Sequence, residues 1–568
     1  MPRLSRPARR NRSPRSLLAR FPRSRIGAAE PAIRQWAEDV HASTESPTGQ
    51  DIRADIAFAA KGGGTLFAGR LFTWGIRFGL AVMLARLLGA GGYGVYNLAL
   101  TVATIAAILP LMGLDAAIVR YTAIFAGRGN WGAVRANIRF MLGVSLVLSL
   151  AVSLGLLVFA EPIALALLHD RRLAPLVMIS ALMVPTLVLN IHLGAALRGL
   201  RRIGHEVIAD QVAQPLIRLA LLLVFILVGL TVSHALFAWT IASMAATVLL
   251  ASFVSRALRH HGGSDAPRLA MGELLRFSAP VFLSNVVSRS GNQFQTILLG
   301  ALSTVSAVGV FVVATNVNLI GSLFHSSLVS ASQPLFAAAQ DRNDRSALQR
   351  LYKLTSKWSL TLNLPIFLVV VAFPEALLAM FGPEFRAGAI PLMILSAANL
   401  ANSATGMSGA VLDMTGHTKF KLLNSTVSVA LGIALNLTLV PTFGLVGAAI
   451  AALAVTAGTN VLSLAEVWLL VGVSPYSRSF MKPIAAGAGA FVASSGVTTL
   501  TGMSGEAISA AAGIPVLLVT YALVLYRLGI DADDRVVLRR VRGRFARVRD
   551  GARGQPPPQS AEHPSRAE

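Results

Sequence analysis

The sequence contains no cysteine in its 568 residues. Disulfide bonds, thiolate metal sites and cysteine nucleophiles are therefore excluded. The ten histidines are scattered along the chain, and the adjacent pair His260 and His261 lacks the spacing of metal ligands. We predict no metal site and no cofactor.

Charged residues are also scarce, at 13% of the chain compared with roughly 25% in an ordinary soluble domain, and 54% of the residues are hydrophobic. The mean hydropathy is +0.64. Because the apolar residues form long runs of about 20, they predict transmembrane helices rather than a soluble core. An outer-membrane barrel would need short alternating strands, a pattern that the sequence lacks. We expect an all-α membrane protein.

The apolar runs give about fourteen candidate spans. They lie near residues 66–88, 95–114, 140–160, 174–197, 210–230, 234–255, 277–301, 306–330, 357–380, 388–411, 421–441, 445–470, 481–501 and 508–527.

The net charge of +24 comes from arginines at helix ends and in two tails. If the amino terminus is inside, the outward connections hold little more than Arg171, Arg172 and Arg386, whereas the inward ones are rich in arginine and lysine. This asymmetry predicts that both termini are cytoplasmic. It also makes anionic inner-leaflet lipids expected partners, and nucleic acid is not expected.

A repeat organises the chain. GVYNLA at Gly94 matches GVFVVA at Gly309, an offset of 309 − 94 = 215, and Leu197 and Gly229 match Leu412 and Gly444 at the same offset. The repeat predicts two six-helix lobes in the same orientation, related by a pseudo-twofold axis along the membrane normal, plus two final helices. In transporters of this plan the substrate lies between the halves.

The expected organisation has six segments, and the first lacks the apolar stretch of a signal peptide. They are a disordered Arg-rich cytoplasmic tail (1–55), an N-terminal six-helix lobe (56–260), a cytoplasmic linker (261–276), a C-terminal six-helix lobe (277–472), helices 13 and 14 (473–528) and a basic, proline-containing cytoplasmic tail (529–568).

The first span carries Arg70, Arg77 and Arg86, although an arginine at the bilayer centre is costly. Seven residues at 100° each fall 20° short of two turns, so Arg70 and Arg77 share one face. Arg86 lies near the outer end and is expected to reach the headgroups. Arg70 and Arg77 would need an environment that water can reach.

The offset of 215 carries this polar face onto the seventh span, where its polar residues are Asn285, Ser288, Arg289 and Asn292. A guanidinium group keeps its charge and can bind two phosphate oxygens at once through two parallel hydrogen bonds. We therefore predict a central cavity that binds a phosphate-bearing anion through Arg70, Arg77, Arg289, Asn285 and Asn292. Simple snorkelling of Arg70 to the inner surface is the alternative for that residue.

Two further sites are candidates. Gln211, Gln214 and Arg218 form a second polar face around Pro215, which either lines the cavity or satisfies a turn opened by the proline. Asp115 is a candidate ion-coupling site, because an intramembrane carboxylate can be tuned in pKa; a structural ion pair or an interface anchor is the alternative.

Four stretches carry a resemblance to a known family. They are ARLLGAGGYGVYNLALTVATI with MGLDAAIVRY, FSAPVFLSNVVSRSGNQFQTILLGALSTVSAVGVF, and AVLDMTGHTKFKLLNSTVSVALGIALNLTLVPTFGLVGAAIA. Together they resemble the polysaccharide and oligosaccharide flippases of the multidrug/oligosaccharidyl-lipid/polysaccharide exporter superfamily, over residues 60–530.

The resemblance implies a fourteen-helix flippase in the bacterial inner (plasma) membrane. It would move undecaprenyl-pyrophosphate-linked oligosaccharide repeat units from the inner to the outer leaflet by alternating access, for exopolysaccharide, capsule or O-antigen assembly. The lipid-linked oligosaccharide is then the expected partner, with other polysaccharide biosynthesis proteins beside it. The cavity arginines would hold the pyrophosphate, and no enzyme activity is expected.

Three other functions remain open. A multidrug cation antiporter of the same superfamily should present carboxylates, whereas the embedded charges here are mostly arginine. A membrane-embedded glycan polymerase or ligase usually builds its site on a large external loop, and the outward connections are short. A scaffold for other biosynthetic proteins would tolerate the loss of Arg77 and Arg289.

Overall fold

The computed structural model describes residues 49–168, 174–259, 271–500 and 505–529. It divides the chain into two compact units, residues 1–71 and 72–568. Of the first unit only a helical backbone is described, so the predicted tails 1–55 and 529–568 lie almost entirely outside the described residues. The predicted linker 261–276 also lies mostly outside them, and the expected domain boundaries stay a prediction.

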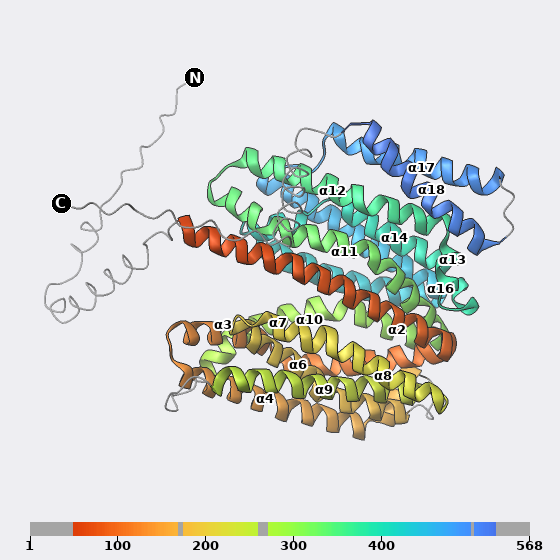
Figure 1. Ribbon diagram of the computed structural model, residues 1–568. Helices are drawn as coiled ribbons and strands as arrows, with labels where there is room; N and C mark the ends of the chain where they lie inside the picture. The colour runs from red at the N-terminus through yellow and green to blue at the C-terminus, as the bar shows by residue number, and fades with distance from the viewer. Residues whose placement is uncertain (1–48, 169–173, 260–270, 501–504, 530–568) are drawn as a thin grey trace, which may run out of the picture. The chain divides into compact units, whose positions relative to one another are not determined.

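Every regular element in the described residues is a helix, as the composition predicts. The first half contains α2 (Gly49–Leu111), α3 (Leu114–Gly127), α4 (Trp131–Val158), α5 (Ala160–Leu168), α6 (Ala174–Gly199), α7 (Ile203–Glu206), the π-helix η5 (Val207–Ala213), α8 (Gln214–Leu227) and α9 (Val232–Arg259). We refer to residues 72–259 as the N-lobe (Figure 1).

The second half begins with α10 (Met271–Leu302), α11 (Val305–Asp341), α12 (Arg345–Ala372), α13 (Pro374–Ala379), η6 (Pro383–Gly388), α14 (Ala389–Ala404), α15 (Ser408–Met414), α16 (Thr418–Glu466) and η7 (Val467–Val471). We refer to residues 271–471 as the C-lobe. The short helix η8 (Arg478–Phe480) leads to α17 (Met481–Leu500) and α18 (Glu506–Arg527), which pack on each other and on α12.

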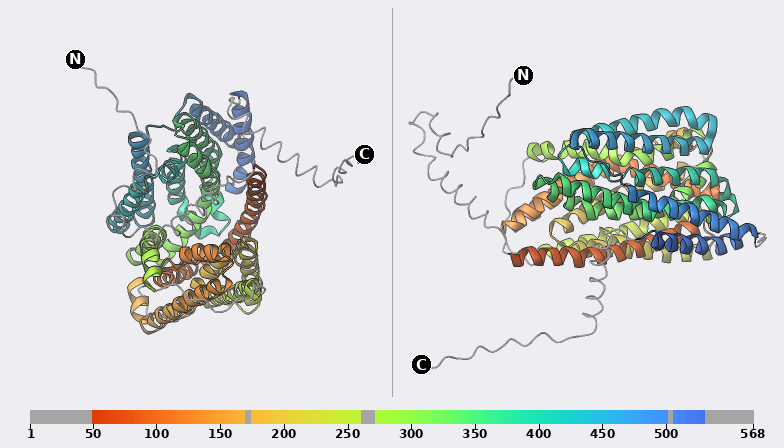
Figure 2. Two further views of the ribbon diagram at one scale, coloured as in Figure 1. Left: turned by 90° about the vertical axis from the view of Figure 1, so that its left-hand side faces the viewer. Right: turned by 90° about the horizontal axis from the view of Figure 1, so that it is seen from above.

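Within the described residues, ten helical segments are long and apolar enough to cross a membrane. The right-hand view of Figure 2 shows the long helices of residues 72–568 lying roughly along one direction, as spanning helices do. Two of the ten, Thr73–Leu111 and Lys419–Val471, each join two predicted spans. The multi-pass membrane fold is thus confirmed, and the count of fourteen stays a prediction.

The two joined helices bend at glycines. Gly89 in α2 has φ 67° and ψ 177°, and Gly444 in α16 has φ 52° and ψ −126°. These are conformations that a residue with a Cβ avoids, so glycine lets the chain turn there without a loop. Gly229, the partner of Gly444 in the repeat, also has a positive φ of 88° and separates α8 from α9.

Beyond its kink, α2 touches α11 of the C-lobe through backbone atoms. A Cβ added at Gly94 would lie 2.0 Å from the carbonyl oxygen of Val305, and one added at Gly309 would lie 2.1 Å from that of Ala90. The offset of 215 exchanges these two contacts, since 90 + 215 = 305 and 94 + 215 = 309. A self-complementary contact of this kind is what a twofold relation between the lobes requires.

Polar bonds accompany this contact. The carboxylate of Glu384 accepts a hydrogen bond of 2.7 Å from the N–H of Ala90, which the kink at Gly89 leaves without a partner inside the helix. Arg86 is exposed, and its Nε donates a hydrogen bond of 2.7 Å to the carbonyl of Met380 in the C-lobe. The lobes are therefore held together at this end of the helices.

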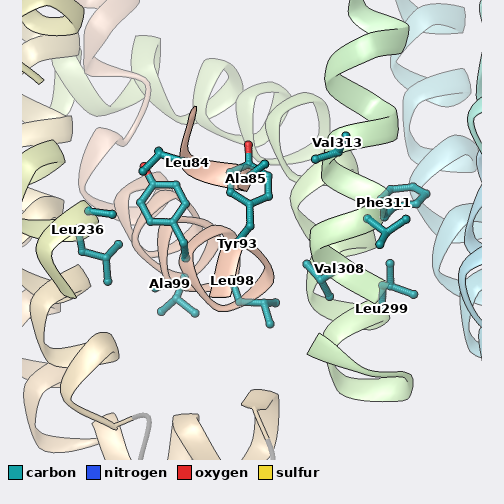
Figure 3. Packing of buried hydrophobic residues seen from close by; sticks show 14 of the residues in the cluster. Leu84, Ala85, Tyr93, Leu98, Ala99, Leu236, Leu299, Val308, Phe311 and Val313 are labelled. Atoms are coloured by element: carbon teal, nitrogen blue, oxygen red, sulfur yellow. The ribbon is translucent and has the colours of Figure 1, made fainter. Parts of the chain in front are cut away.

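The largest apolar cluster joins the lobes beside this contact. It combines Leu84, Leu98 and other residues of α2 with Val308 and Phe311 of α11, and Figure 3 shows the two sets facing each other. Tyr93 lies between them. Because lipid tails are as apolar as these side chains, close packing and small residues hold such helices together.

Candidate functional site

The polar face of α2 is anchored by a carbonyl that proline sets free. Pro215 has no N–H, so the carbonyl of Gln211, four residues earlier, loses its partner within the helix. The hydroxyl of Thr73 donates to that carbonyl over 3.0 Å. The residues before Pro215 form the π-helix η5, a common adjustment at such points. Arg77, one turn after Thr73, is thereby placed beside the start of α8.

A cavity of about 280 Å³ opens where α2, α8, α9 and α11 meet. We call it the central cavity. Its polar lining consists of Arg77, Tyr93, Tyr96, Asn97, Gln214, Arg218, Trp239 and Asn316. The lining comes from both lobes, because Val312 and Asn316 lie on α11 and the other lining residues on N-lobe helices. This is the position that the repeat predicts for a substrate site.

Arg218 is oriented by Tyr96. Its guanidinium donates a hydrogen bond to the Tyr96 hydroxyl, and its Cζ lies 5.6 Å from the centre of the Tyr96 ring. Among the described residues, the buried Nε of Arg218 has no hydrogen-bond partner. A buried donor of this kind needs an explanation, and an anionic ligand supplies one.

Tyr93 and Tyr96 form a rigid wall. Their rings are stacked with centroids 6.1 Å apart, and both rings are buried. The amide of Asn316 donates to the Tyr93 hydroxyl over 3.3 Å, while the amide of Asn97 donates to the Tyr93 carbonyl over 2.7 Å. The cavity wall thus couples the two lobes through polar side chains.

The balance of charge in this region is positive. Arg77 is exposed to the cavity and interacts electrostatically with Asp210 of η5, and Asp210 also interacts with Arg198. Arg198 is itself paired with Glu206. Among the described residues that line the central cavity, two are arginines and none is acidic.

The predicted site residues fall into three groups. Arg77 and Arg218 come together on the central cavity. Asn285 is half-buried on α10 and does not line that cavity. The side chains of Arg70, Arg289 and Asn292 lie outside the described residues, so their roles stay predictions.

Asp115 lies in the first turn of α3, after Gly113 in the left-handed conformation. A carboxylate is stabilised at this end of a helix by the partial positive charge of the N-terminus. Its position suits the structural alternative of the sequence analysis, and ion coupling stays a prediction.

Tyr93 and Tyr96 were not predicted from the sequence as site residues. An aromatic residue in an apolar span is usually interpreted as core, and both rings are indeed buried. Their hydroxyls nevertheless belong to the polar lining, because each accepts a hydrogen bond from another cavity residue. A tyrosine pair three residues apart, beside the glycines 91, 92 and 94, was the available signal.

A second cavity, of about 350 Å³, lies within the C-lobe between α10 and the two arms of α16. Its polar lining among the described residues is Gln295, Ser425, Ser428, Asn436 and Thr456, all of them uncharged. Gln295 donates to the Ala448 carbonyl over 2.7 Å, and Asn436 donates to Gly432 of its own helix over 2.7 Å. Among the described residues, the buried Oδ1 of Asn436 has no partner.

Two family descriptions match the chain. The family described as "Polysaccharide biosynthesis protein" matches residues 59–340, and "MatE" matches residues 280–438.

Curated relatives include two proteins of Haloferax volcanii. "Probable low-salt glycan biosynthesis flippase Agl15" is 27% identical over 172 residues, or 29% of this chain and 36% of the relative. "Probable flippase AglR" is 24% identical over 218 residues, or 37% of this chain and 45% of the relative. The matches span less than half the length of either relative.

Solved structures share the fold. The "Lipid II flippase MurJ, inward closed conformation" aligns with a TM-score of 0.64 at 14% identity, covering 82% of this chain and 99% of that one. The inward-facing multidrug resistance MATE transporter aligns with a TM-score of 0.55 at 16% identity, covering 69% and 94%. With these matches, the chain belongs to the polysaccharide flippase family of the multidrug/oligosaccharidyl-lipid/polysaccharide exporter superfamily.

Proposed function

We propose that this protein is a flippase for a lipid-linked oligosaccharide, and that the central cavity binds the phosphate groups of the lipid carrier. The single observation that carries the proposal is the meeting of Arg77 and Arg218 in one cavity between the lobes, with Nε of Arg218 unpartnered among the described residues. Two guanidinium groups on facing helices can each bind phosphate oxygens in pairs.

The substrate we propose is an undecaprenyl-pyrophosphate-linked repeat unit. It would move from the inner to the outer leaflet of a bacterial inner membrane, with both termini of the protein in the cytoplasm, for exopolysaccharide, capsule or O-antigen assembly. Alternating access would break the contact at Gly94 and Gly309 and open the cavity to the other side. The names of the relatives, both flippases, support this proposal.

The charge of the cavity favours this function over export of cationic drugs. A cationic drug would need a carboxylate in the cavity, and the described lining residues include two arginines and no acid. The pyrophosphate of a lipid-linked sugar has the opposite charge and fits the cavity electrostatically.

The test is complementation of a cell that lacks its own flippase for a lipid-linked glycan. Arg77→Ala and Arg218→Ala should be made at normal levels, abolish glycan export and leave the lipid-linked sugars facing the cytoplasm. The matched control is Arg256→Ala, an exposed arginine on α9 that does not line the cavity, and it should complement fully.

Sidedness of the lipid-linked sugars distinguishes the outcomes. If both cavity variants export glycan at the wild-type rate, the proposed phosphate site is wrong. If wild type itself does not alter sidedness in any strain, the flippase function is wrong, and a scaffold for biosynthetic proteins becomes the better hypothesis.

A further inference from the structure

A second set of arginines lies on the outside of the N-lobe, away from the central cavity. Arg135 and Arg139 of α4 and Arg259 of α9 line a cavity of about 370 Å³. Helices α4 and α9 both pack against α6, whose Leu193 is buried and forms part of the lining. We call this cavity the α4–α9 groove. It shares no lining residue with the central cavity.

The three arginines lie near one end of their helices. Arg135 and Arg139 are four and eight residues after Trp131, the start of α4, which is about 6 and 12 Å along the helix. Arg259 is the last residue of α9. The headgroup zone of a bilayer is roughly 5–8 Å thick on each side, and a long arginine side chain reaches several ångströms towards it. All three guanidinium groups can therefore reach the phosphate level together.

Apart from Ser255, the rest of the groove lining is apolar, and apolar residues continue along the lobe beyond it. Ile138, Leu142, Ala251, Val254 and Leu258 line it. Above Leu142, α4 exposes leucines at every fourth position, and α9 exposes an apolar row in the same way. These residues are Leu146, Leu150 and Leu154 on α4, and Val248, Met244 and Ile241 on α9, with exposed fractions between 37% and 70%.

Charge complementarity identifies the ligand. No acidic residue lines the groove, and within the described part of the chain neither Arg139 nor Arg259 is paired with a carboxylate. An anionic headgroup beside two apolar rows is the chemistry of a membrane phospholipid, and basic pockets between helices bind such headgroups.

We propose that the α4–α9 groove is a binding site for one anionic phospholipid of the surrounding membrane. Arg139 and Arg259 bind its phosphate, Arg135 adds positive charge, and the acyl chains follow the apolar rows of α4 and α9. The lipid bridges two helices that both depend on α6 for their packing, and so it stabilises the N-lobe. This site is independent of the flippase proposal.

The full-length protein in detergent, titrated with dioleoylphosphatidylglycerol and analysed by native mass spectrometry, tests the site. We expect wild type to bind this lipid at least tenfold more tightly than dioleoylphosphatidylcholine. The double variant Arg139→Ala/Arg259→Ala should lose roughly thirtyfold in affinity, because two charges near a phosphate are removed. The control Arg256→Ala, three residues from Arg259 but outside the groove, should bind like wild type.

Equal binding of the two lipids by wild type would overturn the proposal, and so would unchanged affinity in the double variant. Displacement of phosphatidylglycerol by inorganic phosphate at equal concentration would also overturn it, because the groove would then be a simple anion site. Should the double variant fail to fold, Leu142→Trp keeps the charges and fills the apolar part. It should weaken phosphatidylglycerol at least fivefold, and unchanged binding would contradict the role of the apolar rows.

Discussion

The central cavity and the C-lobe cavity differ in charge although the lobes share a repeat. The central cavity takes its arginines, Arg77 and Arg218, from the N-lobe, whereas the C-lobe cavity is lined by amides and hydroxyls such as Gln295 and Asn436. At the offset of 215, Arg77 corresponds to Asn292 and Arg218 to Ile433. At these two positions the repeat keeps the backbone plan but not the charge, so the described linings of the two cavities differ in polarity.

The backbone positions that both lobes keep are the ones where geometry is demanding. Gly94 and Gly309 touch each other's lobes in the same way, and Gly229 and Gly444 both adopt positive φ. Small residues allow backbone approach within a membrane, and no other side chain fits there. The repeat is thus kept at these glycine positions of the backbone, while the side chains that line the cavities differ between the lobes.

The largest expected effect separates the two cavities. The double variant Arg77→Ala/Arg218→Ala should slow transport by about 100-fold or more, since each charged hydrogen-bonding group contributes roughly 1.5–3 kcal/mol. Asn436→Leu in the C-lobe cavity should slow it less than about tenfold, because only a neutral hydrogen bond is lost. The measurement is the initial rate of export in the complemented strain. Equal losses in both cavities would contradict the division of charge.

The second effect tests the symmetric contact. Gly94→Ala and Gly309→Ala should each destabilise the closed contact by about 1–3 kcal/mol, because a methyl group would meet a carbonyl oxygen. A Cβ at Gly91 would lie 3.5 Å from the Ser306 hydroxyl, so the pair Gly91→Cys/Ser306→Cys should cross-link the closed lobes.

The absence of native cysteine makes this cross-link free of background. Both alanine variants should reduce its yield to a similar extent. The control Gly75→Ala, whose Cβ would meet nothing within 4 Å, should leave the yield unchanged. A reduction in only one of the two variants would contradict the twofold relation.

A smaller effect distinguishes the two kinks. Glu384→Gln should destabilise the protein by about 1 kcal/mol, since the charged acceptor for the N–H of Ala90 becomes neutral at a helix start. The kink at Gly444 has no such carboxylate; the nearest atom to its Cβ would be the Ser303 hydroxyl at 3.9 Å. The midpoint temperature of thermal unfolding in detergent should therefore hardly change for Ser303→Ala. A larger decrease for Ser303→Ala than for Glu384→Gln would contradict this difference between the kinks.

The smallest effect concerns matching helix caps. The side chain of Asn130 caps α4 by accepting from the N–H of Ala133, and Asp344 caps α12 by accepting from that of Ala347. The bond from Ala347, followed by the one from Ser346, lowers the pKa of Asp344 below its usual value.

Because this pKa is lower in the folded state, the charged cap stabilises the protein above the usual pKa near 4, and this contribution is lost as the pH falls through the lowered value. The stability difference between wild type and Asp344→Asn should therefore shrink as the pH falls through the lowered pKa of Asp344. In the other lobe, Asn130→Asp should introduce the same pH dependence. Parallel unfolding curves of wild type and Asp344→Asn from pH 2 to pH 6 would contradict this assignment.

The spanning helices were predictable to within a few residues where apolar runs are long, as for 174–197 against α6. The third span was placed at 140–160, but α4 begins at Trp131, because its first two turns carry Asn137 and two arginines that break the apolar run. The helix α3 was missed for the same reason, since Arg120 and other polar residues interrupt its pattern.

The sequence by itself determined the membrane fold and the offset of 215, because these depend on apolar length and position along the chain. The kinks at Gly89 and Gly444 were not predicted, since the sequence analysis placed two separate spans on either side of each glycine. Only the tertiary structure decided that Arg77 meets Arg218 and the two tyrosines. That meeting depends on Thr73 binding a carbonyl that Pro215 sets free 138 residues away along the chain. Such a contact joins two helices through one hydrogen bond, and no periodicity within either helix encodes it.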